Sequence, residues 1–274
     1  MVNGRVGWHG RCPYAILFGK IFSKTTLLMK DLTFSVIVPT YERPLPLAHC
    51  LQALSGLDFP REDFEVIVVD DGGNVDLTAV LQPIADKINI PNGRFLAFTD
   101  DDCRVDGAWL KNLAAALQET PSALVGGQTG NGLPDNLYAS ASQLLIDYLY
   151  DYAARTQSPT MRFFTSNNMA VAAAAFAEIG GFNAAMPLAA GEDREFCGRW
   201  LAAGRPMIFM PAAVVQHYHA LTWRTFWRQH VGYGRGAYQF HQIRAAKQQT
   251  PIRVEPYAFY GQLLRYPFVK GNGR

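Results

Sequence analysis

Short apolar runs alternate with amphipathic stretches along the first half of the chain. Runs that predict buried strands span 34–38, 65–69 and 95–98. Between them, leucines and alanines at helical spacing predict helices over 45–54 and 77–87. Strands that alternate with helices favour a parallel sheet with right-handed crossovers, and near-continuous apolar strands are typical of a sheet buried on both faces. We therefore predict an α/β fold with a mostly parallel central sheet flanked by helices.

The second half of the chain continues this alternation less regularly. Helical patterns cover 109–117, 137–154, 172–179, 194–203 and 222–246, and apolar runs predict strands near 124–125, at 207–210 and at 213–219. The glycines and asparagine of 126–132 predict a turn. Residues 1–30 show neither period, so we expect a disordered extension, with Met29 as an alternative start. The fold itself is expected over 31–246, ending in a helical segment, with a C-terminal tail over 247–274.

Polar residues follow three of the predicted strands at the point where each strand ends. They are Pro39-Thr40-Tyr41, Asp70-Asp71 and Asp100-Asp101-Asp102. In open parallel sheets, ligands collect outside the carboxyl ends of the strands. The sequence therefore predicts one functional site at this edge of the sheet.

The three consecutive aspartates are the strongest candidate for chemistry in the chain. Adjacent like charges repel, and a divalent cation such as Mg²⁺ or Mn²⁺, which prefers oxygen ligands, relieves that repulsion. Because side chains alternate along an extended segment, Asp100 and Asp102 can share one face. The alternative is an acidic cap at the surface with no bound ion.

Composition narrows the classes of protein that these patterns allow. The 274 residues are 49% hydrophobic and 18% charged, with a formal net charge of +2, which is too mild to indicate nucleic-acid binding. The four cysteines form no C-x-x-C pair and fit a reducing compartment, and they favour neither a disulfide framework nor a zinc knuckle. No apolar run approaches the roughly 18 residues of a membrane span.

Six motifs occur in an order that resembles glycosyltransferase family 2, the inverting nucleotide-sugar transferases with the GT-A type fold. They are FSVIVPTYER (34–43), VIVVDDGG (66–73), FLAFTDDDC (95–103), TSNNMAV (165–171), GEDREF (191–196) and VVQHYH (214–219). The resemblance covers about 32–245 and implies a Rossmann-like sheet and a glycosyltransferase domain.

The activity that the resemblance implies is metal-dependent transfer of a sugar from a nucleotide-diphospho-sugar to an acceptor hydroxyl, with inversion. Its cofactor would be Mg²⁺ or Mn²⁺, and its donor most commonly a UDP-sugar. The acceptor would be a sugar or a lipid-linked sugar. The setting would be cell-envelope polysaccharide biosynthesis in the cytoplasm, with peripheral contact at the inner face of the plasma membrane.

The resemblance also assigns roles to individual residues. Pro39, Thr40, Tyr41, Arg43, Asp70, Asp71 and Asp100 would bind the nucleotide; Asp101, Asp102 and His217 would hold the metal; Asn167, Asn168 and Glu192 would face the sugar or acceptor; and Asp193 would be the catalytic base. His219 is the alternative to His217. The alternatives from the residues alone are a helix cap for the acidic pair at 192–193, a plain turn for 70–73 and a loop-to-helix cap for 165–169.

The basic, aromatic segment over 223–236 leaves three interpretations open. It could lie on an anionic membrane, cover the diphosphate with Arg228 or Arg235, or pack as an ordinary amphipathic helix.

One departure from the family pattern stands against the activity. The family's A-R-N segment, which helps build the donor pocket, is missing between Ile90 and Pro91. A catalytically impaired family member is therefore the main alternative. A sugar-1-phosphate nucleotidyltransferase is set aside because the first strand lacks a G-x-G-T-R loop, and a receiver domain because of size.

Overall fold

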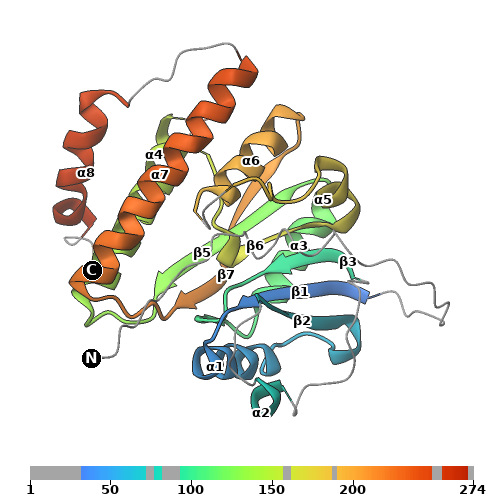
Figure 1. Cartoon of the computed structure of the whole chain (residues 1–274). Coiled ribbons are helices and arrows are strands. Elements are labelled where there is room, and N and C mark those ends of the chain that lie inside the picture. The colour runs from blue at the N-terminus through green and yellow to red at the C-terminus, as the bar shows by residue number, and fades with distance from the viewer. Residues whose placement is uncertain are drawn as a thin grey trace.

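The computed structural model describes residues 32–71, 77–81, 93–156, 162–186, 190–248 and 255–270. The predicted extension over 1–30 lies outside these residues, as do Gly72, Gly73 and the Ile90–Pro91 junction. At the centre lies one seven-stranded sheet (Figure 1). Its strands are β1 (Leu32–Thr40), β2 (Phe64–Asp70), β3 (Gly93–Phe98), β4 (Cys103–Val105), β5 (Leu124–Asn131), β6 (Met169–Ala172) and β7 (Met207–His217).

The strand order is β2-β1-β3-β6-β5-β7-β4. Strand β1 pairs in parallel with β2 and β3, and β5 pairs in parallel with β7. Strands β6 and β4 run antiparallel to their neighbours. Five strands therefore point the same way, which confirms the mostly parallel sheet.

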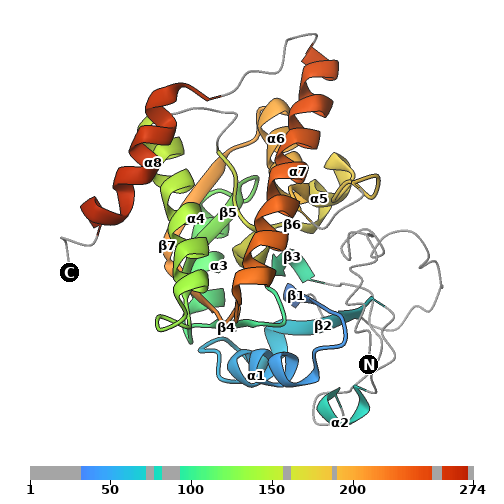
Figure 2. The ribbon, with the colours of Figure 1, turned by 60° about the vertical axis from the view of Figure 1, so that its left-hand side comes forward.

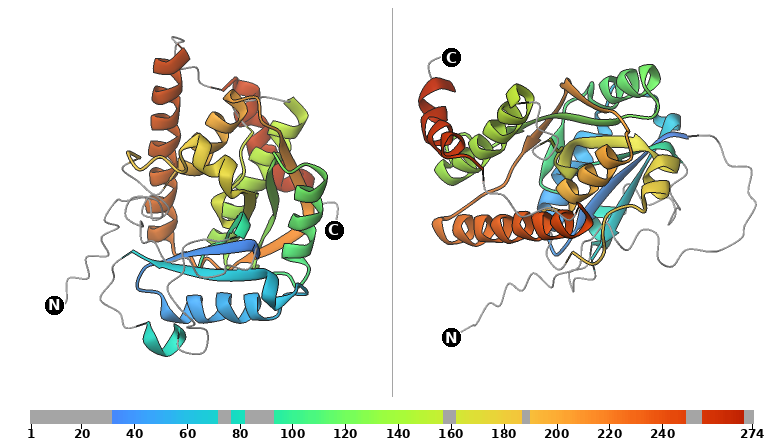
Figure 3. Two further views of the ribbon diagram at one scale, coloured as in Figure 1. Left: turned by 90° about the vertical axis from the view of Figure 1, so that its right-hand side faces the viewer. Right: turned by 90° about the horizontal axis from the view of Figure 1, so that it is seen from above.

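Helices cover both faces of the sheet and one end of it (Figures 1 and 3). They are α1 (Pro44–Ser55), α2 (Thr78–Leu81), α3 (Trp109–Glu119), α4 (Leu137–Thr156), α5 (Ala173–Ile179), α6 (Glu192–Ala202), α7 (Trp223–Gln248) and α8 (Tyr257–Lys270), with short 3₁₀ turns η2 (Arg61–Asp63) and η3 (Ser166–Asn168). Within the described residues, none of these helices has the combination of length and apolar character needed to cross a bilayer.

Two apolar clusters lie on opposite faces of the sheet. On one face, α1 packs against β4 and α3 packs against β7 and β5, with Leu47 and Trp109 both fully buried. On the other, α5 and α6 pack through Phe176, Phe196 and Trp200. Burying side chains of this size contributes roughly 1.5–3 kcal/mol each, so these two layers hold the sheet that carries the polar strand ends.

The C-terminal helices form a separate layer, which Figure 2 shows beside the sheet. Helix α8 packs on α4, where the buried Tyr148 hydroxyl donates to the carbonyl of Phe259 at 2.6 Å. The segment over 247–274, expected as a tail, thus contains a packed helix. The predicted helix over 222–246 is present as α7.

The predicted turn over 126–132 is wrong, because β5 continues through it to Asn131. Its glycines serve close packing instead of chain reversal. A Cβ on Gly126 would lie 2.1 Å from the ring of Phe164, and one on Gly127 would lie 2.2 Å from the carbonyl oxygen of Ala213.

The two strands predicted at 207–210 and 213–219 form the single strand β7. A register shift in its pairing with β5, between Gly127 and Gln128, takes up the residues between them. Strand β7 ends at His217, so the last two residues of the predicted run leave the sheet. Of the helix predicted over 77–87, only α2 lies among the described residues.

Gly93 gives a test of the packing between β3 and β1. A Cβ at this position would lie 2.2 Å from the backbone nitrogen of Ser35 and 2.3 Å from the backbone carbon of Phe34, so Gly93→Ala must displace backbone. We expect a loss of about 1–3 kcal/mol in the free energy of unfolding, measured by urea denaturation. Gly232→Ala is the control, because a Cβ on this α7 residue meets nothing within 4 Å. It should be neutral or stabilising by about 0.5–1 kcal/mol; equal losses in both variants would contradict this packing.

Candidate active site

The predicted polar strand ends meet at one edge of the sheet. Thr40 lies opposite Asp70 in the β1–β2 pair, and Asn131 lies opposite His217 in the β5–β7 pair. The loop after β3 enters the same edge, where the backbone N–H of Thr99 donates to the carbonyl of Ile37 at 3.2 Å. Parallel strands account for this convergence, because their carboxyl ends share one edge.

Asp101 is fully buried beneath the end of β1. Its Oδ2 accepts hydrogen bonds from the Thr40 hydroxyl at 2.7 Å and from Arg43 Nε at 3.1 Å, and Oδ1 is paired with the Arg43 guanidinium. Burial raises the pKa of Asp101 to about 7, which outweighs the lowering effects of Arg43 and Thr40. Asp101 thus ties the aspartate loop to β1, and its oxygens are occupied by protein donors here.

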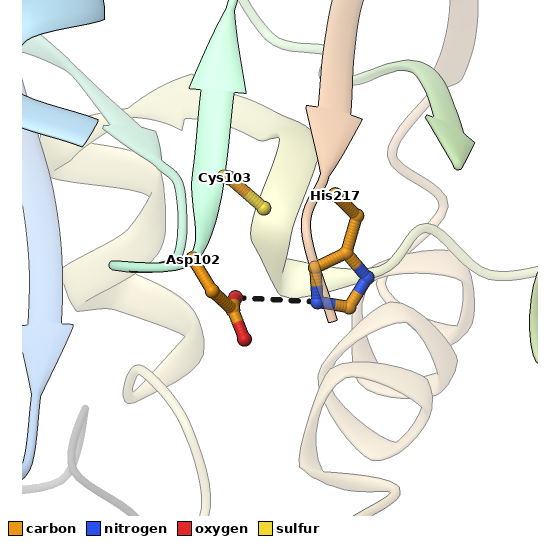
Figure 4. Close-up of side chains that lie close together, drawn as sticks. All are labelled: Asp102, Cys103 and His217. Carbon is orange, nitrogen blue, oxygen red and sulfur yellow. Dashed lines mark ion pairs between the residues drawn. The ribbon is translucent and has the colours of Figure 1, made fainter. Parts of the chain in front are cut away.

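Asp102 meets His217 at the end of β7 (Figure 4). Its Oδ1 lies 3.2 Å from His217 Nε2, and its Oδ2 accepts a hydrogen bond from Arg43 Nη1 at 2.8 Å. Burial tends to raise the pKa of Asp102, but the His217 and Arg43 charges outweigh it and hold that pKa below its usual range. Asp102 is therefore ionised at neutral pH.

The two histidines of the VVQHYH motif have different environments. Burial tends to lower the pKa of His217, but the Asp102 carboxylate outweighs it and raises that pKa. Burial together with the neighbouring His217 lowers the pKa of His219 to about 4, so His219 is neutral at pH 7. His217 lies at 3.2 Å from Asp102, whereas His219, when protonated, acts on Asp102 through its charge.

Cys103 is a site residue that the sequence reasoning missed. It lies directly opposite His217 in the β4–β7 pair and is fully buried. Its sulfur, an Asp102 oxygen and a His217 nitrogen all lie within 4.8 Å of one another. The only signal in the sequence was its position immediately after the three aspartates.

Asp102 and His217 have the donor chemistry that a divalent metal requires. A carboxylate suits Mg²⁺ or Mn²⁺, and an imidazole nitrogen is a common second ligand. Burial, together with the negative charges of Asp100 and Asp102, raises the pKa of the Cys103 thiol, which stays protonated at neutral pH and does not coordinate a hard ion. Asp101 would bind the metal only if its carboxylate first released Arg43.

A second pair of carboxyl groups lies at the start of α6. Glu192 is buried, with Oε2 lacking a hydrogen-bond partner, and Asp193 accepts a 2.6 Å hydrogen bond from the backbone N–H of Arg194. Burial raises the pKa of Glu192 to about 8, with the Asp193 charge adding to it, and burial raises the pKa of Asp193 to about 6. The charge of Asp100 raises both pKa values further.

The helix terminus is too weak to reverse these shifts. A helix N-terminus favours a carboxylate by roughly 0.3–1 kcal/mol, whereas one pKa unit corresponds to about 1.4 kcal/mol, so burial of Asp193 dominates. At pH 7 the pair holds one proton, mainly on Glu192, while Asp193 is mostly ionised. Groups whose pKa values are separated in this way are typical of acid–base chemistry.

Helix α7 lies against this acidic pair through a contact between backbones. A Cβ on Gly236 would lie 2.0 Å from the carbonyl oxygen of Ala190, and Gly191, at φ 86°, faces Gly236 in the same contact. The contact brings in Tyr233, which the sequence reasoning also missed. Burial of its hydroxyl raises the pKa of Tyr233, with the charges of Asp193 and Asp100 adding to the shift.

The residues predicted to bind a nucleotide line the ends of β1 and β2. The backbone N–H of Asp71 donates to the carbonyl of Thr40 at 3.0 Å, which holds the two strand ends together. Pro39 is buried, Tyr41 is half-exposed and Asp70 is exposed. The two glycines that follow Asp71 lie outside the described residues.

Of the two asparagines predicted to face a sugar, Asn168 is held by hydrogen bonds within the protein. It is 1% exposed. Its Oδ1 accepts from Trp109 Nε1 at 2.9 Å, and its Nδ2 donates to the carbonyls of Gln128 and Ala213 at 3.0 Å. These bonds join η3 to α3, β5 and β7 and leave no donor hydrogen for a ligand. Asn167, also buried, accepts at Oδ1 from Thr165 and Thr129.

Models of known families match most of the chain. Residues 95–269 match the model described as glycosyl transferase family group 2, and residues 35–92 match the one described as glycosyl transferase family 2. Among curated proteins, the poly(ribitol-phosphate) beta-N-acetylglucosaminyltransferase TarS of Staphylococcus aureus is 27% identical over 159 residues. The alignment covers 48% of this chain and 28% of TarS, so the chain spans only a part of that relative's length.

Solved structures resemble the fold over a larger part of the chain. The mannosyltransferase PcManGT from Pyrobaculum calidifontis, in complex with GDP-Man and Mn²⁺, superposes with a TM-score of 0.56 at 15% identity, covering 92% of this chain and 73% of that one. GalNAc-T7 with UDP, GalNAc and Mn²⁺ gives a TM-score of 0.52 at 15% identity, covering 70% of this chain and 44% of that one. These likenesses confirm the predicted GT-A type fold class.

The buried Glu192 gives a test of the electrostatics through the pH dependence of stability. Its folded pKa, about 8, lies above its ordinary value of 4.5. Its contribution to stability is therefore complete below about pH 4.5 and is lost as the pH rises through about 8. We expect Glu192→Gln to gain stability relative to the unsubstituted protein between about pH 5 and about pH 9, measured by urea denaturation.

The control for this prediction is Gln118→Ala, which replaces an exposed, uncharged side chain on α3. Its stability difference from the unsubstituted protein should stay constant over the same pH range, because neither side chain titrates. Parallel behaviour of the two variants would contradict the burial of the Glu192 carboxyl group.

Proposed function

The chain is a member of glycosyltransferase family 2, and we propose that it transfers a sugar from a nucleotide-diphospho-sugar to an acceptor hydroxyl, with inversion and with a divalent metal. The observation that carries the proposal is that the charge of Asp100 acts on two pairs of side chains, one carboxylate–imidazole pair and one carboxyl pair. Asp102 with His217 supplies metal ligands, and Glu192 with Asp193 supplies separated pKa values. Each pair suits one half of a displacement reaction.

Asp193 is proposed as the general base. It accepts the proton of the acceptor hydroxyl as that oxygen attacks the anomeric carbon, and a pKa of about 6 leaves it mostly ionised at pH 7. Glu192, which keeps its proton there, donates a hydrogen bond to the acceptor or the donor sugar. Attack from the Asp193 side, opposite the departing diphosphate, inverts the anomeric centre.

The donor side is proposed to lie at the ends of β1 and β2. Asp70 or Asp71 accepts a hydrogen bond from the base, and Thr40, Tyr41 and Arg43 line the pocket. A metal held by Asp102 and His217 would offset the charge that develops on the departing nucleoside diphosphate. The proposed donor is a UDP-sugar, with a GDP-sugar as the alternative, since solved proteins of this fold hold UDP or GDP-Man together with Mn²⁺.

One feature of the sequence keeps the impaired-enzyme alternative open. The two family matches meet between residues 92 and 95, beside the Ile90–Pro91 junction where the A-R-N segment is missing. If the chain bound nucleotide and metal without turnover, the missing A-R-N segment would account for it.

The proposed setting, by similarity to TarS, is the synthesis of a cell-envelope polymer.

Asp193→Asn tests the proposed mechanism. We expect Mn²⁺-dependent binding of UDP or GDP, measured by calorimetry, to be kept, while the transfer rate with the corresponding nucleotide sugars falls by about 10²–10⁴-fold. Asp135→Asn, at an exposed position, is the control and should change neither quantity. Full activity of Asp193→Asn would refute the assigned base. Binding without turnover in the unsubstituted chain would support the impaired alternative.

The N-terminal end of α7 carries an exposed apolar surface, which we define as the Trp patch: Trp223 and Trp227. Their exposed fractions are 55% and 51%, and the centroids of the two rings lie 5.3 Å apart. Helix α7 has four arginines, one lysine and no acidic residue. Exposed tryptophans beside cations are typical of surfaces that bind anionic membranes, so a peripheral membrane contact is proposed here.

Vesicle binding tests this contact. We expect the protein to cosediment with vesicles that contain phosphatidylglycerol but not with purely phosphatidylcholine vesicles. Because each buried tryptophan contributes roughly 1.5–3 kcal/mol, Trp223→Ala with Trp227→Ala should lower partitioning more than about tenfold. Leu45→Ala, which removes an exposed leucine on α1, is the control. Undiminished binding of the double variant would exclude the Trp patch as the contact.

A further inference from the structure

A carboxylate, a thiol and an imidazole converge where β4 and β7 pair. The relevant atoms of Asp102, Cys103 and His217 lie within 4.8 Å of one another, as Figure 4 shows for the side chains. Cys103 and His217 are direct partners across the two strands. Asp102 is fixed to the same frame, because the backbone N–H of Tyr218 donates to its carbonyl at 2.8 Å. Three different ligand types are thus held by sheet backbone.

This donor set differs from one that serves hard ions alone. Carboxylate oxygen suits Mg²⁺ and Mn²⁺, whereas thiolate sulfur selects Zn²⁺ and similar soft ions, and imidazole binds Zn²⁺ well. Three protein ligands with one open position are also the arrangement that zinc adopts in catalytic sites. Neither Asp102 nor His217 needs to change its strand position for Cys103 to become the third ligand.

We propose that Asp102, Cys103 and His217 form a site for a thiophilic divalent cation, Zn²⁺ or Cd²⁺, which competes with the hard metal of the proposed transfer reaction. The proposal rests on that function only for the identity of the competing ion. Binding forms metal–sulfur, metal–nitrogen and metal–oxygen bonds. The thiol proton and the proton that His217 Nε2 shares with Asp102 pass to solvent, and no electrons are transferred.

The other described cysteines are held away from this donor set. Cys197 lies against the backbone of Phe164, with its sulfur 3.4 Å from that residue's nitrogen, and Cys50 is 1% exposed within the α1 core. Neither belongs to a group of three ligand-type side chains among the residues that the structure describes. They therefore provide matched controls, together with Cys12, for any signal that arises from a thiolate.

The test is a titration of the full chain with Cd²⁺, monitored by the thiolate-to-metal charge-transfer absorption in the near ultraviolet. We expect this absorption in the unsubstituted protein and its loss in Cys103→Ala, with Cd²⁺ affinity lowered at least about tenfold. Cys12→Ala, Cys50→Ala and Cys197→Ala should keep it. Absence of the band from the unsubstituted protein, or its persistence in Cys103→Ala, would overturn the proposal.

A second readout separates competition at this site from a folding defect. Free Mn²⁺ is followed by electron paramagnetic resonance while Zn²⁺ is added. Zn²⁺ should release bound Mn²⁺ from the unsubstituted protein at concentrations at least about tenfold lower than from Cys103→Ser, which keeps the side-chain volume. Equal Zn²⁺ requirements for both proteins would overturn the proposal. Because the cadmium titration needs neither nucleotide nor turnover, its result stands apart from the outcome of the transferase assay.

Discussion

The burial of Asp101 under Thr40 and Arg43 is the constraint on which the rest of the site depends. Three carboxyl groups in a row cannot all face one cavity without strong repulsion. Here the middle one turns into the protein, where a hydroxyl and a guanidinium satisfy it, while Asp100 and Asp102 serve different neighbours. The charge of Asp100 reaches Asp193, and Asp102 meets His217. The pairing of Asp101 with Arg43 thus neutralises one of the three carboxyl groups and lowers the repulsion within the loop.

Much of this arrangement follows from local sequence. The parts that do not follow from it share one cause. Apolar runs and the polar residues after them are local signals, so the strands of the first half and the shared edge were predictable. Which way Asp101 points, and that Asn168 is used up by Trp109, depend on residues more than fifty positions away. The turn predicted at Gly126 and Gly127 was wrong for the same reason, because the atoms that require glycine there lie in Phe164 and Ala213.

Burial raises the pKa values of the carboxyl groups at this site, and neighbouring cations lower them. Which effect is larger differs from one group to the next. Asp102 keeps a low pKa because a cationic partner lies within 3.2 Å, whereas Glu192 is equally buried and has only a like charge beside it. Asp102 and Glu192 differ less in burial than in their neighbours. A buried carboxyl group is therefore ionised at one place and protonated at the other.

The contact between Gly191 and Gly236 has a consequence for how such a site can diversify. Because the wall over the acidic pair is positioned by main chain against main chain, its placement is independent of the side chains that α7 presents around Tyr233. Those side chains can be exchanged while the main-chain contact between α7 and the start of α6 is kept. The position of the helix and the chemistry of the surface it presents can therefore change independently.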